Sequence, residues 1–147
     1  LSTPSHYKEP DGLYGRSLEV AVPYFIQYLS NKYHVRTHLD YALDETQLNE
    51  DLVADIYKII YEALTSAILN GAGQNYRLSL KQYNEKIWLT INDDANSFSN
   101  FKSQINFDMA MYFIRQIANK YNATVNTFEQ QNQGSQLVIS IPLRTLK

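Results

Sequence analysis

The spacing of apolar residues changes several times along this chain, and the order of the changes is what most constrains its fold. Three stretches have the helical spacing typical of amphipathic helices: 17–32, 52–67 and 107–121. Five shorter segments are predicted strands, the first three by alternation of apolar and polar residues: 35–40, 76–81, 87–91, 123–129 and 136–142. This order predicts an α/β fold, a two-layer sandwich in which a mixed, mostly antiparallel sheet is covered on one face by helices.

Cap and turn residues mark the ends of these elements. Pro23 lies inside the first predicted helix and predicts a kink there, because a proline ring removes a backbone hydrogen bond. Asn49 is a favourable cap for the second helix, which we expect to end near Gly71. The polar turn at 83–85 predicts a hairpin between the strands on either side of it.

Length and charge exclude several classes of protein. The 147 residues predict one domain over 16–147, preceded over 1–15 by an arm or linker that contains prolines and glycines. The net charge of −2 and the lack of a lysine and arginine stripe exclude nucleic acid as the main partner. No apolar run approaches the roughly 18 residues that cross a bilayer, so we expect no membrane contact. The lack of cysteine fits a reducing compartment.

Polar residues on the second predicted helix are the first candidates for a functional site. Glu62, Ser66 and Asn70 are spaced i, i+4 and i+8, so they share one helical face, which we expect to lie away from the apolar stripe. Such a face either lines a pocket or is simply solvated. Asp93 and Asp94 follow a predicted strand, where an acidic pair either belongs to a site or forms a turn. The residues alone leave these alternatives open.

Three motifs, in this order, resemble those of the ATP-binding domain of sensor histidine kinases, in the GHKL superfamily. They are Glu-Ala-Leu-Thr-Ser-Ala at 62–67, Ile-Asn-Asp-Asp-Ala-Asn-Ser-Phe at 91–98 and Gly-Ser-Gln-Leu-Val-Ile-Ser-Ile-Pro at 134–142. The resemblance covers 18–143, and three ordered motifs are more specific than any one of them. It implies a left-handed α/β sandwich, the Bergerat fold, with ATP and magnesium as cofactors.

Several positions match the family's motifs. Glu62 corresponds to the acidic residue of the first motif and is the expected catalytic residue. Asp93 corresponds to the aspartate that recognises the amino group of adenine. Gly134 and Ser135 correspond to a glycine and threonine pair, of which the hydroxyl is kept. Asn70 matches a position often held by histidine or tyrosine. The resemblance therefore implies that these residues line a nucleotide site.

Other positions of the first two motifs depart from the family. Ser66 stands where the family has the asparagine that holds magnesium, so Ser66 is the expected metal ligand in a weakened metal site. Ala95 and Ser97 replace two glycines, and no glycine occurs anywhere between Gly73 and Gly134. Side chains therefore project where the backbone of the family approaches the nucleotide, with strain if either position requires a positive φ.

The start of the third predicted helix departs as well. Asp108 and Ala110 fall where the family has a second glycine-rich motif. A helix N-terminus binds phosphate through its free N–H groups, and the Asp108 carboxylate competes for them as a built-in phosphate mimic. The same carboxylate is also a favourable first-turn residue. The lid over 99–107 contains no glycine, so we expect it to be comparatively fixed.

Two functions fit this combination of matches and departures. The departures favour a degenerate histidine-kinase-like domain of a two-component sensor, which binds ATP weakly or not at all and acts as a regulatory or docking module. The alternative is an active catalytic domain that transfers the γ-phosphoryl group of ATP to a histidine on a separate dimerisation domain. The sequence leaves open whether the domain is an enzyme.

The resemblance also implies partners. They are the dimerisation and phosphoacceptor domain of the parent sensor and a response regulator, and the expected location is the cytoplasm even if the parent is anchored in a membrane. A phosphoacceptor histidine lies in an acidic helix, and none of the three histidines of this chain has such surroundings. We expect them to be ordinary surface residues: His6, His34 and His38.

Overall fold

A computed structural model describes residues 17–71, 73–95, 97–98, 105–130 and 134–143. The predicted arm and most of the predicted lid lie outside these residues. The elements follow one another as α1 (Leu18–Tyr33), β1 (Arg36–Ala42), the short 3-10 helix η1 (Glu45–Gln47), α2 (Glu50–Asn70), β2 (Asn75–Tyr83), β3 (Lys86–Asp93), α3 (Ile105–Asn119), β4 (Thr124–Gln130) and β5 (Gly134–Pro142).

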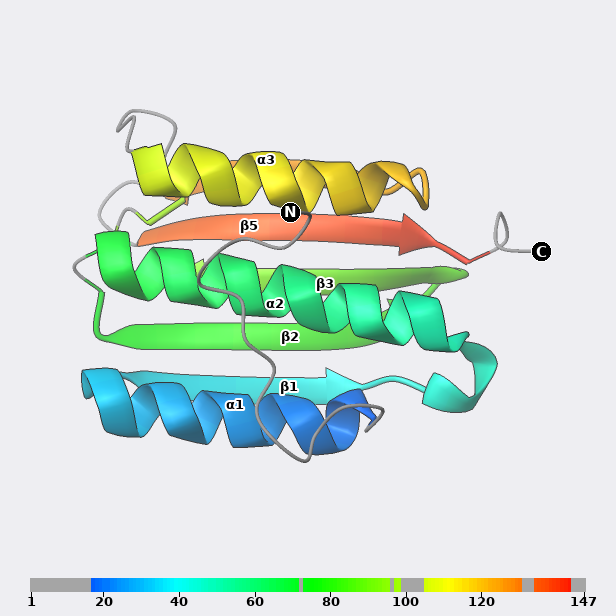
Figure 1. Cartoon of the computed structure of the whole chain (residues 1–147), viewed down its shortest axis with the longest axis horizontal. Helices are drawn as coiled ribbons and strands as arrows, with labels where there is room; N and C mark the ends of the chain where they lie inside the picture. The colour runs from blue at the N-terminus through cyan, green and yellow to red at the C-terminus, as the bar shows by residue number, and fades with distance from the viewer. Residues whose placement is uncertain (1–16, 72, 96, 99–104, 131–133, 144–147) are drawn as a thin grey trace.

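The strands form one mixed sheet in the order β1-β2-β3-β5-β4. β1 pairs with β2 in parallel, and the other neighbours are antiparallel. All three helices cover the same face of the sheet, with α1 over β1, α2 over β2 and β3, and α3 at the end of the sheet formed by β5 and β4 (Figure 1). This arrangement confirms the predicted two-layer α/β sandwich.

The core lies between the sheet and the helices, and strand alternation builds it. One inward row runs across four strands, because Leu39 pairs with Leu78, Leu78 with Ile91, and Ile91 with Leu137. The last three of these side chains are completely buried. The helices complete the core with the apolar stripes predicted from their spacing, from Leu18 on α1 to Ile114 on α3. Burial of apolar surface is the main term that holds such layers together.

α1 is capped from a distant part of the chain. Its N-cap residue, Ser17, forms no capping bond through its side chain. Instead, the carboxylate of Glu45 in η1 accepts hydrogen bonds from the backbone N–H groups of Leu18 and Glu19, each at 2.9 Å. A carboxylate at this end of a helix satisfies free N–H groups and is favoured by the helix dipole. The helix then continues through Pro23 without interruption.

α2 is the central helix, with α1 on one side and α3 on the other (Figure 1). The side chain of Asn49 caps it by accepting a hydrogen bond from the N–H of Leu52 at 2.8 Å, as predicted. Its second half is buried at every position from 62 to 67. This half of α2 therefore buries polar side chains as well as apolar ones.

Candidate functional site

Asp93 is the centre of a buried hydrogen-bond network at the end of β3. Its side chain points inward because it continues the buried alternation of that strand, and the residue is 4% exposed. Oδ1 accepts from the backbone N–H of Ser135 at 3.0 Å and from its hydroxyl at 2.6 Å. Oδ2 accepts from the N–H of Ser97 at 3.0 Å. The register explains the first pair, since Ser135 on β5 lies opposite Asp93.

The network continues into the loop after β3. The Ser135 hydroxyl donates to Asp93 and accepts from the backbone N–H of Phe98 at 2.9 Å. Phe98 itself is 1% exposed and belongs to the core. An ionised carboxylate has about four acceptor positions, and donors from the described residues take three of them on Asp93. With respect to these residues, one position on Oδ2 remains for a further donor.

Gly134 is required at its position by geometry. Its φ is +97°, a left-handed conformation that side chains disfavour, and a Cβ there would lie 1.8 Å from the backbone oxygen of Asp93. The absence of a Cβ lets the start of β5 approach β3 closely enough for Ser135 to reach the carboxylate. Among the described glycines, Gly134 has the closest approach to backbone atoms of another strand.

Ser97 fills the space between the loop after β3 and the end of α2. Its hydroxyl donates to the backbone oxygen of Ala67 at 3.3 Å, and a Cβ on Gly71 would lie 2.2 Å from its Oγ. Neither Ala95 nor Ser97 has a positive φ, so the strain considered for these positions is absent. The described non-glycine residues with positive φ are His34, Asn84, Glu85 and Asn122.

The predicted polar face of α2 is buried, which corrects the expectation that it lies away from the apolar stripe and rules out a solvated face. Glu62 is 0% exposed and Ser66 is 6% exposed, because α2 is covered by both neighbouring helices and the sheet. Asn70 is half-buried, and its Nδ2 donates to the backbone oxygen of Ser66 at 3.0 Å and lies 3.3 Å from its hydroxyl oxygen. The three residues share a face as predicted.

The two predicted residues of α3 differ in exposure. Asp108 is exposed in the first turn of the helix, whereas Ala110 is 3% exposed. The structure brings Asp93, Ser97, Gly134 and Ser135 together, and Ser97 links this cluster to α2. Asp94 is separate from its neighbour: it is exposed and accepts from the N–H of Gln74 at 2.9 Å and the side chain of Asn75 at 2.7 Å. Asp94 therefore has the turn role and Asp93 the buried one.

Tyr76 lies opposite Asp93 and adds a titratable group to the cluster. Burial, together with the charge of Asp93, raises the pKa of Tyr76 from its ordinary value of 10.0 to about 12. The folded protein then keeps a proton that the unfolded chain loses, so this contribution to stability is complete below pH 10.0 and disappears towards about pH 12.

Raising the pH through this range is expected to lower the free energy of unfolding, and Tyr76→Phe is expected to reduce the slope of that fall. Denaturant unfolding at a series of pH values measures both slopes. The variant should retain part of the slope, because burial also raises the pKa of Tyr41 and of Tyr121. Equal slopes in the two proteins would contradict the assignment to Tyr76.

The sequence reasoning missed another buried carboxylate besides Asp93 and Glu62, namely Asp55 in the first half of α2. Its Oδ2 accepts from the hydroxyl of Tyr121 and lies 2.7 Å from the ammonium group of Lys120. Lys58 lies 3.9 Å from Oδ1. Together with Asn49, Asp51 and Ala54 these residues line a pocket of about 480 Å³. The sequence does contain a sign of this site, because Asp55 lies within the apolar stripe of α2, three residues after Leu52, where a buried charge requires partners.

Within the described part of the chain, no helix combines the length and hydropathy needed to cross a membrane. Nor does any group of three or more histidine, cysteine, aspartate or glutamate side chains gather there in a way that could hold a metal ion.

The mixed five-stranded sheet with three helices on one face has the fold of histidine-kinase ATP-binding domains. Comparison with solved structures finds this fold in a blue-light activated histidine kinase of Erythrobacter litoralis EL346, with a TM-score of 0.71 and 15% identity over 86% of this chain and 42% of that one. No family model and no curated protein matches the sequence.

Two isolated domains have the same fold. The catalytic domain of the histidine kinase ThkA matches with a TM-score of 0.59 and 16% identity, over 82% of this chain and 88% of that one. The ATP-binding domain of PrrB from Mycobacterium tuberculosis matches with a TM-score of 0.56 and 15% identity, over 80% and 93%. At these identities the likeness establishes the fold, and this chain corresponds to less than half of the light-activated kinase.

Proposed function

We propose that residues 16–147 form a histidine-kinase-like ATP-binding domain with a degenerate nucleotide site, which serves as a regulatory or docking module of a two-component sensor. The observation that carries the proposal is the side chain of Ser97. It bonds the loop after β3 directly to Ala67 of α2 and packs against Gly71. The resemblance implies a glycine at position 97, where the backbone of the family approaches the nucleotide. In this chain the position holds a serine with a buried side chain.

The predicted metal ligand supports the same conclusion. The hydroxyl oxygen of Ser66 lies within hydrogen-bond distance of the Asn70 amide, and that amide also bonds the Ser66 carbonyl. Magnesium prefers near-octahedral oxygen ligands and usually one or two carboxylates. A buried hydroxyl already engaged by a neighbouring amide fits that requirement poorly. We therefore expect magnesium to bind weakly or not at all.

The exposed carboxylate of Asp108 acts in the same direction. It occupies the first turn of α3, where the resemblance implies contact with the phosphates of a nucleotide. Its negative charge repels a phosphate and competes for the N–H groups of that turn. A unit charge about 4 Å away costs about 4 kcal/mol at an effective dielectric constant near 20. This term alone would lower nucleotide affinity by about a thousandfold.

An active catalytic domain is the second candidate, and the Asp93 cluster favours it. Asp93, Gly134 and Ser135 are positioned together, and donors from the described residues leave one acceptor position on Oδ2, which the amino group of an adenine would fill. In that case Glu62 would be the catalytic residue and the acceptor would be a histidine on a separate domain. The intact cluster would then bind the base, while Ser97 and Asp108 would only weaken the binding.

Calorimetric titration with Mg-ATP, and separately with ADP, tests the proposal. We expect no binding tighter than the millimolar range and no rise in melting temperature at millimolar nucleotide. Micromolar binding would overturn degeneracy in favour of the active domain. A variant with Ala95→Gly, Ser97→Gly and Asp108→Gly should gain affinity, and Asp94→Gly is the control because Asp94 lies outside the cluster. An equal response of both variants would contradict the roles given to Ser97 and Asp108.

The partners of the parent protein are part of the proposal. They are its dimerisation and phosphoacceptor domain and a response regulator, with the domain in the cytoplasm. The histidine-kinase fold supports the first of these, since the light-activated kinase that shares it is more than twice as long as the segment matched here. The docking role requires a surface that the nucleotide site does not use.

A further inference from the structure

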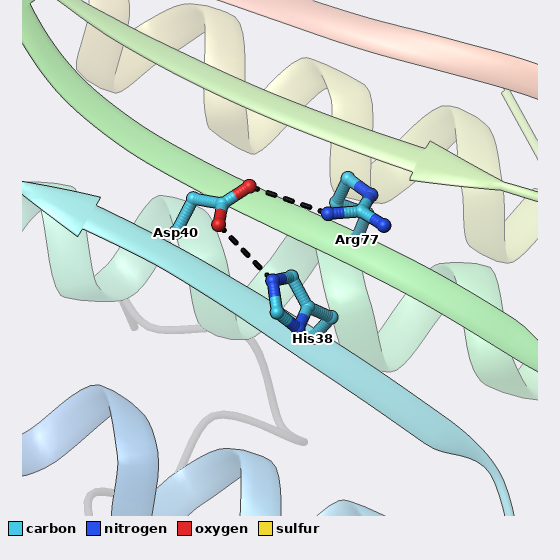
Figure 2. Close-up of polar contacts among 3 residues, drawn as sticks. All are labelled: His38, Asp40 and Arg77. Carbon is cyan, nitrogen blue, oxygen red and sulfur yellow. Dashed lines mark hydrogen bonds and ion pairs between the residues drawn. The ribbon is translucent and has the colours of Figure 1, made fainter.

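The face of the sheet turned away from the helices is uncovered in the described part of the chain, and we refer to it as the open face. Figure 2 shows His38, Asp40 and Arg77 on this side of β1 and β2, with the helices behind the strands. Strand alternation gives the open face its members, which are residues 36, 38, 40 and 42 of β1, 75, 77, 79, 81 and 83 of β2, 86, 88, 90 and 92 of β3, 136, 138, 140 and 142 of β5, and 124, 126 and 128 of β4.

Charge on the open face has one dominant sign. Four of its members are exposed cations: Arg36, Arg77, Lys81 and Lys86. Its single carboxylate, Asp40, lies 3.4 Å from Arg77 and 3.0 Å from His38. The chain as a whole has a net charge of −2, so the remaining surface is acidic. The cations all come from β1, β2 and β3, and the β5 and β4 members of the face are uncharged. The positive charge is therefore concentrated on one half of the face.

Aromatic side chains lie within this basic half and at the rim of the open face. Trp88 is half-buried in the middle strand, directly opposite Lys81, and the ammonium group of Lys86 lies 5.6 Å from the centre of its ring. Tyr83 and Phe128 are 66% and 50% exposed. Arginine, tryptophan and tyrosine are enriched in protein interfaces and in their energetic centres, whereas a solvated sheet face needs none of them. The composition of the basic half therefore indicates a binding surface.

We propose that the open face binds an acidic partner protein, whose carboxylates meet Arg77, Lys81 and Lys86 and whose apolar side chain packs on Trp88. Charge complementarity favours an acidic partner, because the cations are grouped on this face near the Trp88 ring while the rest of the chain is acidic. The inference gives a surface and a chemistry to the docking role proposed above. It does not depend on the state of the nucleotide site, which lies on the helical side of the sheet.

Trp88 provides a direct measurement, because it is the only tryptophan in the chain. The probe is a synthetic peptide of glutamate with interspersed phenylalanine, titrated into the full chain while tryptophan emission is recorded. We expect a saturable change in emission that weakens as salt is added. A peptide of the same length with lysine in place of glutamate should leave the emission unchanged. No response to the acidic peptide, or an equal response to the basic one, would overturn the proposal.

Charge reversal locates the contact. Arg77→Glu and Lys81→Glu are each expected to weaken peptide binding about fivefold, and Lys81→Glu is expected to leave the melting temperature unchanged. Lys32→Glu on α1 is the matched control, because Lys32 is an exposed cation on the helical side. Equal weakening by the control would overturn the proposal. So would a Trp88 response to anionic lipid vesicles or to a single-stranded oligonucleotide without one to the peptide.

Titration of the same samples with Mg-ATP separates this inference from the proposed function. If the chain binds the peptide and also binds ATP at micromolar strength, only the proposal of a degenerate nucleotide site is contradicted. If it binds neither the peptide nor ATP, only the proposed role of the open face is contradicted. The result that supports the inference is peptide binding by the unaltered chain that is weakened in the two open-face variants and not in Lys32→Glu.

Discussion

Replacing Gly134 by alanine is expected to lower the free energy of unfolding by about 4 kcal/mol. The residue has a φ of +97°, and the new Cβ would be placed 1.8 Å from the backbone oxygen of Asp93. A backbone atom cannot turn aside as a flexible side chain can, so β5 must move away from β3. Ser135 would then lose its bonds to the carboxylate. Thermal and denaturant unfolding would measure the loss.

Gly73→Ala is the control for this experiment. Gly73 has no positive φ, and its Cβ would meet the side chains of Asp94 and Tyr76 instead of backbone. We expect its effect to be less than half as large. Similar losses in the two variants would show that any added methyl group near this loop destabilises the protein. The special role given to Gly134 would then be wrong.

The second large effect is expected from Asp93→Asn, at about 3 kcal/mol of unfolding free energy. Two donors from Ser135 point at Oδ1 and one from Ser97 points at Oδ2, so the NH₂ group of an asparagine must face the donors of one of these two serines. The mutation therefore leaves buried donors without an acceptor and removes charge-assisted bonds. Denaturant unfolding at neutral pH would measure the difference.

Asp94→Asn is the matched control, because it makes the same chemical change one residue away. Asp94 is exposed, and water can replace the acceptor that its donors lose. Burial raises its pKa, but hydrogen bonds from Asn75 and Gln74 outweigh that effect and lower it overall. We expect a loss below about 1 kcal/mol. A larger loss from Asp94→Asn than from Asp93→Asn would contradict the structural role of the buried network.

Local pattern was sufficient to predict the helices, the strands and the class of the sheet. Helical spacing and strand alternation are properties of neighbouring residues, and burial of one face is enough to explain them. The cap on α1 could not be predicted in this way, since Glu45 lies 26 residues from Glu19. The strand order was equally out of reach, because register between distant strands depends on packing of the whole chain.

The candidate site was only partly accessible from the sequence. Asp93 and Ser135 are 42 residues apart, and only the resemblance to a family placed them in one site. The burial of Glu62 was missed because spacing shows which residues share a face of α2, but not how many neighbours cover the helix. Asp55 and Tyr121 are 66 residues apart, and no local pattern pairs them. Long-range contacts of this kind require the fold first.

The parallel pairing at one edge of the sheet affects how the chain assembles. Tyr83 meets Lys86 across a tight hairpin, whereas Arg36 meets Asn75 only after α2 has formed and crossed the sheet. Loop-closure entropy makes this edge contact more costly to form. We therefore expect α1 and β1, joined through the Glu45 cap, to dock as a unit onto the hairpin. Without that unit β2 would be the edge strand, and its unpaired backbone groups could pair with a strand of another molecule.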